Sequence, residues 1–131
     1  REFRRDRRLG RVGGTTVVFD NNFNALYFSK EIIPFYDQKN IKQREEPPVF
    51  HHVGVYAYKT KTLLSYNSWG ESNLELLEGL EQIRFLENTC SIKCVLVDSK
   101  GRKFWELNNP EDVQRIENVI NENLYEKRKE K

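Results

Sequence analysis

The most regular alternation of hydrophobic and polar positions lies in residues 72–86, SNLELLEGLEQIRFL. Leu76, Leu80 and Ile83 follow one another at spacings of four and three, which is typical of an amphipathic helix. The pattern therefore predicts a helix over this stretch, with one apolar stripe that faces a core. Gly79 lies beside the stripe, where the absence of a side chain would let a neighbouring element approach closely.

A capping box marks the start of this predicted helix. Ser72 and Glu75 have the spacing at which the serine hydroxyl accepts from the backbone N–H of residue 75 while the glutamate accepts from the N–H of Ser72. We therefore expect the helix to begin at Ser72.

Glu81 is the least ordinary position of the predicted helix. Its side of the helix also carries Leu74, Leu77 and Phe85, so its carboxylate should lie at the edge of an apolar surface. A carboxylate in such surroundings is unfavourable unless another group pairs with it. We therefore expect a partner for Glu81.

Residues 51–58, HHVGVYAY, alternate as a strand does, with the small aliphatic residues on one face and the aromatic ones on the other. His52 and Tyr56 would project together, and Gly54 would leave room between them, so one interpretation is the wall of a ligand cleft. The other interpretation, which the ordinary partial burial of His and Tyr favours, is that both lie at the edge of the core with satisfied hydrogen bonds.

Shorter runs predict the remaining strands. Residues 15–19 and 25–28 are β-branched or aromatic and are separated by the turn-forming residues 20–22, so they predict two strands or a hairpin. Residues 92–97 predict a further strand, and residues 104–105 a short one. Strands that alternate with helices predict an α/β layered arrangement.

The pattern also predicts a last helix near the end of the chain. Asn109 is suited to the N-cap and Pro110 to the first helical position, where its missing N–H costs nothing. Two acids then follow at the positive end of the helix dipole. The apolar positions at helical spacing are Val113, Ile116, Ile120 and Leu124.

Charge divides the chain unevenly. The 131 residues suit one domain, with a formal net charge of +2. Residues 1–12 carry six Arg against two acids, which leaves 16 of the 22 basic and 18 of the 20 acidic residues in the remainder. We expect residues 1–14 to form a basic arm and residues 125–131 a charged tail. Such an arm can bind nucleic acid or an acidic membrane, but the slightly acidic body and the lack of a basic stripe place nucleic acid last among the expected partners.

No apolar run reaches the roughly 20 residues that span a bilayer, and no signal peptide is visible, so we expect a cytoplasmic protein without membrane contact. Cys90 and Cys94 are the only cysteines. A single CxxxC pair with two distant histidines is poor evidence for zinc, so structural thiols are the better interpretation.

Four stretches carry a resemblance to a known family, and they cover roughly residues 15–122. They resemble the C-terminal half of the 3-deoxy-manno-octulosonate cytidylyltransferases, the CMP-Kdo synthetases of lipopolysaccharide biosynthesis. The stretches are NALYFSKEIIPF (24–35), HHVGVYAYK (51–59), SNLELLEGLEQIR (72–84) and NNPEDVQRIE (108–117).

The resemblance implies a nucleotide-diphospho-sugar transferase fold, a Rossmann-like α/β sandwich with a mixed sheet. It implies a transferase that moves CMP from CTP to the anomeric hydroxyl of the sugar acid, with magnesium as cofactor and release of pyrophosphate. Residues 15–124 would form the half that binds the sugar.

The resemblance also implies a set of sugar-binding residues. His52, Tyr56, Glu81 and Gln82 match positions that line the sugar pocket in such enzymes. A carboxylate beside a carboxamide can bind the hydroxyls of a polyol, with further donors from His and Tyr. Lys30 stands where the family usually has Arg, which keeps the charge and loses the bidentate fork for a sugar carboxylate.

Two departures from the family bear on activity. Asn108 stands where the family has an Asp that helps to hold magnesium, and a carboxamide is a weaker ligand for a hard cation. The family's CTP-binding half, with its phosphate loop, has no counterpart in residues 1–14. Because transfer depends on positioning and neutralising the phosphates, we expect this chain alone to be inactive, with no catalytic residue of its own. The alternative is a non-catalytic sugar-binding or dimerisation module, in which case a homodimer is a possible assembly.

Overall fold

The computed structural model describes residues 14–37, 39, 48–98, 107 and 109–129, with side chains as far as residue 121. Residues 14–95 form one compact unit, and the described residues from 96 onward belong to a second. The predicted division into an arm (1–14), a sugar-binding half (15–124) and a tail (125–131) stays a prediction.

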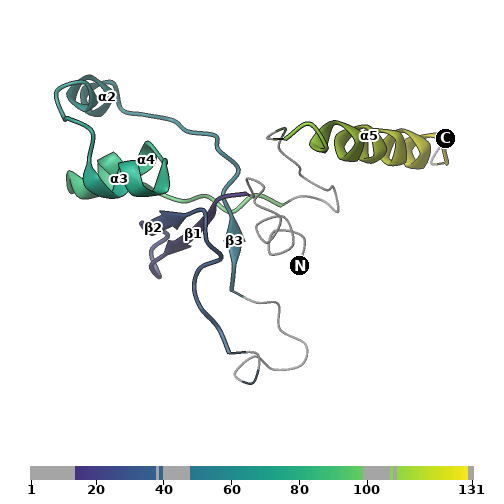
Figure 1. The fold of residues 1–131 in the computed structure, drawn as a ribbon, viewed down its shortest axis with the longest axis horizontal. Helices are drawn as coiled ribbons and strands as arrows, with labels where there is room; N and C mark the ends of the chain where they lie inside the picture. The colour runs from purple at the N-terminus through teal and green to yellow at the C-terminus, as the bar shows by residue number, and fades with distance from the viewer. Residues whose placement is uncertain (1–13, 38, 40–47, 99–106, 108, 130–131) are drawn as a thin grey trace. The chain divides into compact units, whose positions relative to one another are not determined.

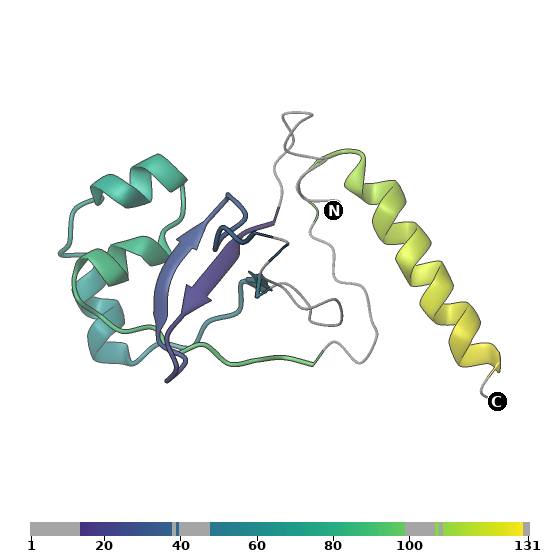
Figure 2. The same ribbon diagram turned by 90° about the horizontal axis from the view of Figure 1, so that it is seen from below.

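The first unit is built on a three-stranded sheet in the order β2-β1-β3. The strands are β1 (Thr16–Phe19), β2 (Ala25–Ser29) and β3 (Phe50–His51). β1 and β2 form the predicted hairpin, with Val17 opposite Phe28. Helices lie on one side of this hairpin (Figures 1 and 2), so the α/β class is confirmed. Every pairing among the described strands is antiparallel, and the parallel strands of a mixed sheet are not among them.

The hairpin turn is organised by Asp20, one of the residues expected there. Its carboxylate accepts from the backbone N–H groups of Asn22 and Asn24, both at 2.8 Å, and from the Asn24 amide at 3.0 Å. These bonds, with the Asn24 backbone bond the largest cause, lower the pKa of Asp20. Phe23 takes the left-handed conformation that closes the turn.

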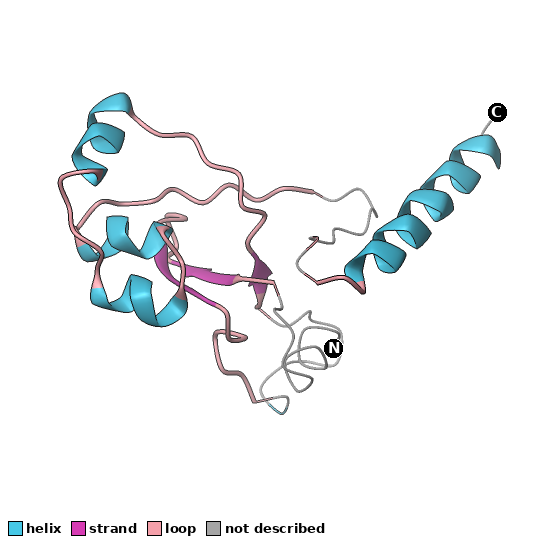
Figure 3. Ribbon diagram, turned by 45° about the horizontal axis from the view of Figure 1, so that its top comes forward, coloured by secondary structure: helices cyan, strands magenta, loops and turns pink. Residues whose placement is uncertain are grey.

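The strand predicted over residues 51–58 is wrong for most of its length. Only Phe50 and His51 pair, opposite Val17 and Thr16 of β1, and Gly54 then leaves the extended region with φ +79°. The chain continues as a long loop (Figure 3). The sequence of residues 52–58 therefore alternates as in a strand, although no described strand pairs with this segment.

A helix that the sequence pattern missed follows this loop. α2 spans Thr60–Tyr66, has no acid in its first turn, no side-chain cap and no buried residue. A helix is predicted in sequence from capping residues, acids in the first turn and an apolar stripe. Because α2 lacks these features, its sequence carries little signal for a helix.

Two short helices, α3 (Asn73–Glu78) and α4 (Gln82–Glu87), stand where a single helix was predicted over residues 72–86. The continuity of that prediction is wrong because Gly79 adopts the left-handed conformation, φ +61°, and ends α3. Such a conformation is easy for glycine and is a common way to end a helix.

The predicted capping box at the start of α3 is confirmed. The backbone N–H of Ser72 donates to the Glu75 carboxylate at 3.1 Å. A second carboxylate from the end of α4, that of Glu87, accepts from the backbone N–H groups of Leu74 at 3.3 Å and Glu75 at 3.4 Å. The two helices therefore hold each other at the N-terminus of α3.

The core lies between the hairpin and α4. Ile83 is completely buried against Phe28, Val17 and Ala25. Leu80 packs against this cluster, as the predicted stripe requires, whereas Leu76 is 61% exposed because the break at Gly79 separates α3 from the part of the stripe that reaches the core. The other partly buried residues around the core are Tyr27, Leu86, Ile92 and Cys94.

The strand predicted over residues 92–97 is reduced to one bridge, between Lys93 and Asn24. The Ala25 N–H donates to the Ile92 carbonyl at 2.8 Å, and the Cys94 N–H to the Phe23 carbonyl at 2.7 Å. Cys90 and Cys94 are free thiols, as expected. The strand predicted at residues 104–105 lies outside the described residues.

The second unit contains α5 (Asp112–Lys129). The helix begins two residues after Pro110, and Asp112 holds Asn109 by accepting from its N–H at 2.7 Å and its side-chain amide at 3.0 Å. The helix was thus predicted in the right region, but the prediction that Pro110 takes its first position is wrong by two residues. Among the residues that the structure describes, none of the helices is long and apolar enough to span a membrane.

Candidate functional site

His52 and Tyr56 point to the inside of the loop that follows β3. Both are half-buried, while Val55 between them is 85% exposed. The Tyr56 hydroxyl and His52 Nε2 lie 2.6 Å apart in a hydrogen bond. The face expected to carry the ligand wall is therefore the inner face, and the two side chains satisfy each other as the second interpretation required.

Tyr56 is a neutral phenol in this setting. Burial is the largest cause that raises its pKa far above the ordinary value, with smaller contributions from Tyr58 and Cys94. The residue can therefore donate or accept a hydrogen bond, but it does not ionise near neutral pH.

A chain of aromatic rings connects the loop to the sheet and to α4. His52 contacts Phe28 edge-on, with ring centroids 5.3 Å apart, and stacks at an angle on Tyr56 at 5.3 Å. Tyr56 stacks on Tyr58 at 5.8 Å, which in turn reaches Phe85 of α4 at 5.3 Å. We call His52, Tyr56 and Tyr58 the aromatic wall.

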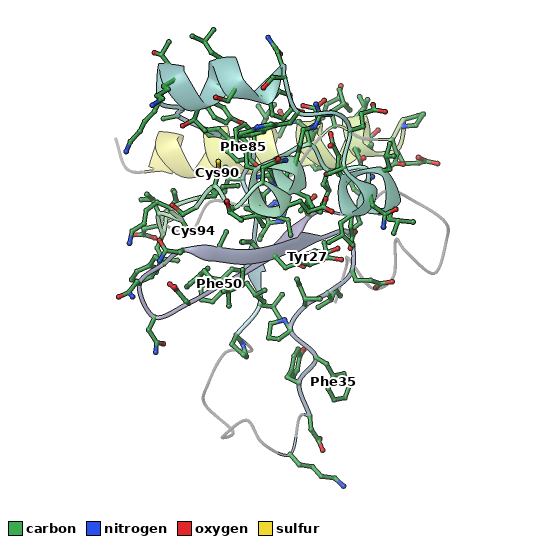
Figure 4. The ribbon with its side chains drawn as sticks, turned by 90° about the vertical axis from the view of Figure 1, so that its left-hand side faces the viewer. Tyr27, Phe35, Phe50, Phe85, Cys90 and Cys94 are labelled. Atoms are coloured by element: carbon green, nitrogen blue, oxygen red, sulfur yellow. The ribbon has the colours of Figure 1, made fainter. Side chains whose placement is uncertain are left out.

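Phe85 is the point at which this wall meets the helices. Its ring lies 5.0 Å from that of Tyr66 and 5.7 Å from that of Trp69, and only 5% of the residue is exposed. Figure 4 shows Phe85 on the helical side of the sheet and Phe50 on the other. The end of the 51–69 stretch is therefore anchored on α4 through rings.

Glu81 lies at the N-cap position of α4 and is exposed. The expectation that it shares a helix face with Leu74 and Leu77 is wrong, because the break at Gly79 separates these residues from α4. Its charge contributes, after burial, to the raised pKa of Tyr58. Glu81 therefore lies close to the aromatic wall.

Gln82 is buried next to the exposed Glu81. Only 8% of the residue is exposed, and its Nε2 has no hydrogen-bond partner among the described residues. Buried polar groups in proteins are nearly always paired, and leaving one unpaired is costly. Gln82 Nε2 is therefore a donor whose capacity is unused within the described residues.

Lys30 reaches the same turn from the end of β2. Its backbone N–H donates to Glu78 at 3.0 Å. Its ammonium lies so near Gly79 that a Cβ at that position would be 2.7 Å from Nζ. Lys30, Glu81 and Gln82 therefore gather around the α3–α4 turn, although Lys30 is 51 residues away in the sequence from Glu81.

An ion pair that the sequence pattern missed braces this turn. Arg84 donates to both oxygens of Glu75, from Nε at 2.6 Å and Nη2 at 2.5 Å, and its guanidinium lies 4.2 Å from the ring centroid of Tyr66. The bond from Arg84 is the main cause that lowers the pKa of Glu75. In a continuous helix, residues nine apart are about 13 Å apart along the axis, so the break at Gly79 makes this pair possible.

The five predicted site residues thus form two connected groups within residues 14–95. Lys30, Glu81 and Gln82 surround the α3–α4 turn, and His52 and Tyr56 belong to the wall that reaches Phe85. Within the part of the chain that the structure describes, His, Cys, Asp and Glu side chains form no group of three or more that could hold a metal. Asn108, which stands where the family has a magnesium ligand, lies outside the described residues.

Comparison with known sequences identifies a family. A family profile described as Cytidylyltransferase matches residues 5–93. The 3-deoxy-manno-octulosonate cytidylyltransferase of Maricaulis maris is 42% identical over 117 residues, which are 89% of this chain and 44% of the relative. The 8-amino-3,8-dideoxy-manno-octulosonate cytidylyltransferase of a Shewanella strain is 40% identical over 101 residues, 77% of this chain and 38% of the relative.

The solved structures add a match in three dimensions. A CMP:2-keto-3-deoxy-manno-octonic acid synthetase complexed with CTP superposes with a TM-score of 0.67 at 26% identity, covering 84% of this chain and 42% of that one. The chain thus spans less than half the length of the relatives it matches. The family profile begins at residue 5, so part of the stretch 1–14, which was expected to lie outside the resemblance, lies inside it. Because the profile covers most of the chain and fold and sequence agree, the chain belongs to the cytidylyltransferase family, of the CMP-Kdo synthetase type.

Proposed function

We propose that this chain forms the sugar-binding part of a 3-deoxy-manno-octulosonate cytidylyltransferase. The complete enzyme would transfer CMP from CTP to the anomeric hydroxyl of the sugar acid and release pyrophosphate. The observation that carries the proposal is the buried Gln82 amide without a partner among the described residues, beside an exposed carboxylate and an ammonium at the same turn.

Each residue has a role that its chemistry supports. The Lys30 ammonium would bind the carboxylate of the sugar acid as a point charge. Gln82 Nε2 would donate to a sugar hydroxyl, and Glu81 would accept from one. The His52–Tyr56 pair would offer a polar edge and ring surface on the other side of the sugar.

The remaining functions belong to the complete enzyme. We assign no catalytic residue to this chain, and CTP would bind only where the other half is supplied. Magnesium would act there as well, beside the phosphates of CTP. A cytoplasmic location, where CTP is available, is part of the same proposal.

Two measurements on the 131-residue chain test the proposal. Titration calorimetry with 3-deoxy-manno-octulosonate should show binding that Glu81→Ala and Gln82→Leu weaken at least about tenfold, since each removes a charged or buried hydrogen bond. Glu117→Ala, an exposed acid of α5, is the control and should bind as the unmodified chain does. Equal binding by all four proteins would overturn the proposal.

The second measurement is magnesium-dependent pyrophosphate release with CTP and the sugar acid. We expect none from the chain alone. Turnover that disappears in Glu81→Ala would contradict the inactive-half interpretation and would show that a CTP site is formed, for example by assembly of two chains.

The same titration can identify which sugar the chain binds. The relatives include enzymes named for 3-deoxy-manno-octulosonate and for its 8-amino-3,8-dideoxy form. Parallel titrations with both sugars decide which of them this chain prefers.

A non-catalytic sugar-binding or dimerisation module is the second candidate. The observation that favours it is the number of exposed apolar side chains in residues 14–95, among them Leu64, Leu77, Val55 and Val95. Large exposed apolar surface is typical of a face that another protein covers. Light scattering across a range of chain concentrations would support this candidate if the mass doubled, and a constant monomer mass would contradict the dimer.

A further inference from the structure

The end of β2 and the end of α3 are joined by one carboxylate, that of Glu78. Ser29 Oγ donates to its Oε1 at 2.8 Å, and the backbone N–H of Lys30 donates to its Oε2 at 3.0 Å. Both oxygens are thus engaged by adjacent residues that lie 48 or 49 positions earlier in the sequence. Hydrogen bonds to a charged acceptor are stronger than neutral ones, so this contact fixes where the chain leaves the sheet.

The main chain is held on both sides of Lys30. Ser29 is buried, and its Oγ also accepts from the N–H of Glu31 at 2.9 Å. Thr16 Oγ1 donates to the Glu31 carbonyl at 2.5 Å. The backbone around Lys30 is therefore fixed to β1 and to α3, although its side chain is exposed.

The side chain of Lys30 crosses the bare backbone of Gly79. A Cβ at position 79 would stand 2.7 Å from Lys30 Nζ and 3.9 Å from its Cε. Gly79 lies between Glu78, which holds the Lys30 backbone, and Glu81, at the proposed sugar site. A Cβ at position 79 would therefore force the ammonium to shift from the position that it holds at this turn.

We propose that Glu78 and Gly79 are positioning residues for the Lys30 ammonium. Glu78 fixes the main chain from which the side chain starts, and Gly79 provides the space in which its charge lies beside Glu81 and Gln82. A lysine is a flexible point charge without the planar fork of arginine, so it gains most from being placed by its surroundings. The inference rests on the proposed function in one respect, that this ammonium binds the carboxylate of the sugar acid.

The direction in which Glu78→Gln changes the affinity for an anion distinguishes positioning from simple electrostatics. If Glu78 acted only as a nearby negative charge, Glu78→Gln would strengthen the binding of an anion. If Glu78 positions Lys30, the same change weakens binding, because one of its two acceptor oxygens is lost. The double variant with Lys30→Gln and Glu78→Gln should then bind the sugar acid no more weakly than Lys30→Gln alone.

The test compares two ligands by calorimetry, 3-deoxy-manno-octulosonate and its C1 carboxamide. The unmodified chain should prefer the acid about tenfold or more, as expected for a charged hydrogen bond. Glu78→Gln and Gly79→Asn should lose most of this preference while they still bind the amide. Asparagine is chosen because it tolerates the left-handed conformation and still adds a Cβ.

Gly70→Ala is the matched control, because a Cβ there meets nothing within 4 Å. It should keep the full preference for the acid. The inference is overturned if Glu78→Gln strengthens acid binding, or if Gly79→Asn retains the preference for the acid.

A measurement without ligand keeps this result separate from the proposed function. In the free chain, NMR should show a nuclear Overhauser effect between the Lys30 Hε protons and the Gly79 Hα protons, which Glu78→Gln should weaken. Its absence from the unmodified chain would overturn the positioning. Its presence in a chain that binds no sugar acid would support the positioning and contradict only the proposed function.

Discussion

The two sides of α4 are built in different ways. Ile83 faces the hairpin and lies in the hydrophobic core with Val17 and Phe28, where the neighbouring strands are joined by backbone hydrogen bonds. Phe85, two residues further and so on nearly the opposite face, is enclosed by the rings of Tyr58, Tyr66 and Trp69. No strand pairing reaches this second region within the described residues, because the sheet ends at His51.

The difference separates a part of the unit that is held by its backbone from a part that carries two of the proposed site residues. The hairpin side is fixed by the backbone, so it tolerates changes in individual side chains that keep its volume. The aromatic side depends more on contacts between particular rings, although the His52 backbone N–H also donates to the Thr15 carbonyl at 2.9 Å, and it carries His52 and Tyr56. Of the five proposed site residues, Lys30 alone comes from the hairpin, and Glu78 holds it to the helices.

The largest expected effect on stability comes from a substitution on the hairpin side of α4. Ile83→Ala should lower the free energy of unfolding by about 3 kcal/mol, because it leaves a cavity in a completely buried position. Leu77→Ala, at a position that is 75% exposed, is the control and should change it by less than about 0.5 kcal/mol. Urea denaturation followed by circular dichroism measures both. A loss of the same size in the two variants would show that Ile83 is not the centre of this core.

The next effect concerns the pair that braces the turn between the two regions. Glu75→Gln should cost about 1–3 kcal/mol at neutral pH, because Arg84 and Ser72 both donate to this carboxylate. The pKa of Glu75 is lowered in the folded state, so its contribution is present above the unfolded value of about 4.3 and is lost as the pH falls through the folded value.

The pH dependence makes this prediction specific. The difference in stability between the unmodified chain and Glu75→Gln should shrink as the pH falls below about 4. Glu117→Gln, at an exposed position of α5, serves as control and should follow the unmodified chain at every pH. A difference that stays constant from neutral to acid pH would contradict the role given to the Arg84 bond.

A smaller effect sharpens the contrast on the aromatic side. Phe85→Leu keeps most of the volume and loses the ring contacts, so it should cost about 1 kcal/mol. We expect the near-ultraviolet circular dichroism to fall, since Tyr58, Tyr66 and Trp69 lose their common partner, while the far-ultraviolet spectrum is unchanged. If the near-ultraviolet signal persisted, the rings would be held by something other than Phe85.

The smallest effect concerns Tyr56→Phe, which removes one hydrogen bond and should cost about 0.5–1 kcal/mol. The pKa of Tyr56 is raised in the folded state, so its contribution is complete below the unfolded value of about 10 and is lost as the pH rises through the folded value. The unmodified chain should therefore lose stability above about pH 10 more steeply than Tyr56→Phe does. Parallel pH profiles for the two proteins would be evidence against the buried hydroxyl.

Local patterns determined the parts of this protein that depend on neighbours in the chain. The β1–β2 hairpin, the turn at Asp20 and the capping box at Ser72 follow from residues only a few positions apart. The motifs also identified the family, since the stretches that carry the resemblance are themselves contiguous. Periodicity located α4 and the burial of Ile83.

Only the tertiary structure decided where these parts meet. The break at Gly79 was hidden because a glycine beside an apolar stripe is compatible with both a continuous and an interrupted helix. The inner face of residues 52–58 was decided by Phe28 and Phe85, and not by its own alternation. Lys30 reaches Glu78 across 48 residues. A sequence pattern reports spacing along the chain, whereas a site is made of contacts between distant segments, and those contacts depend on how each element ends.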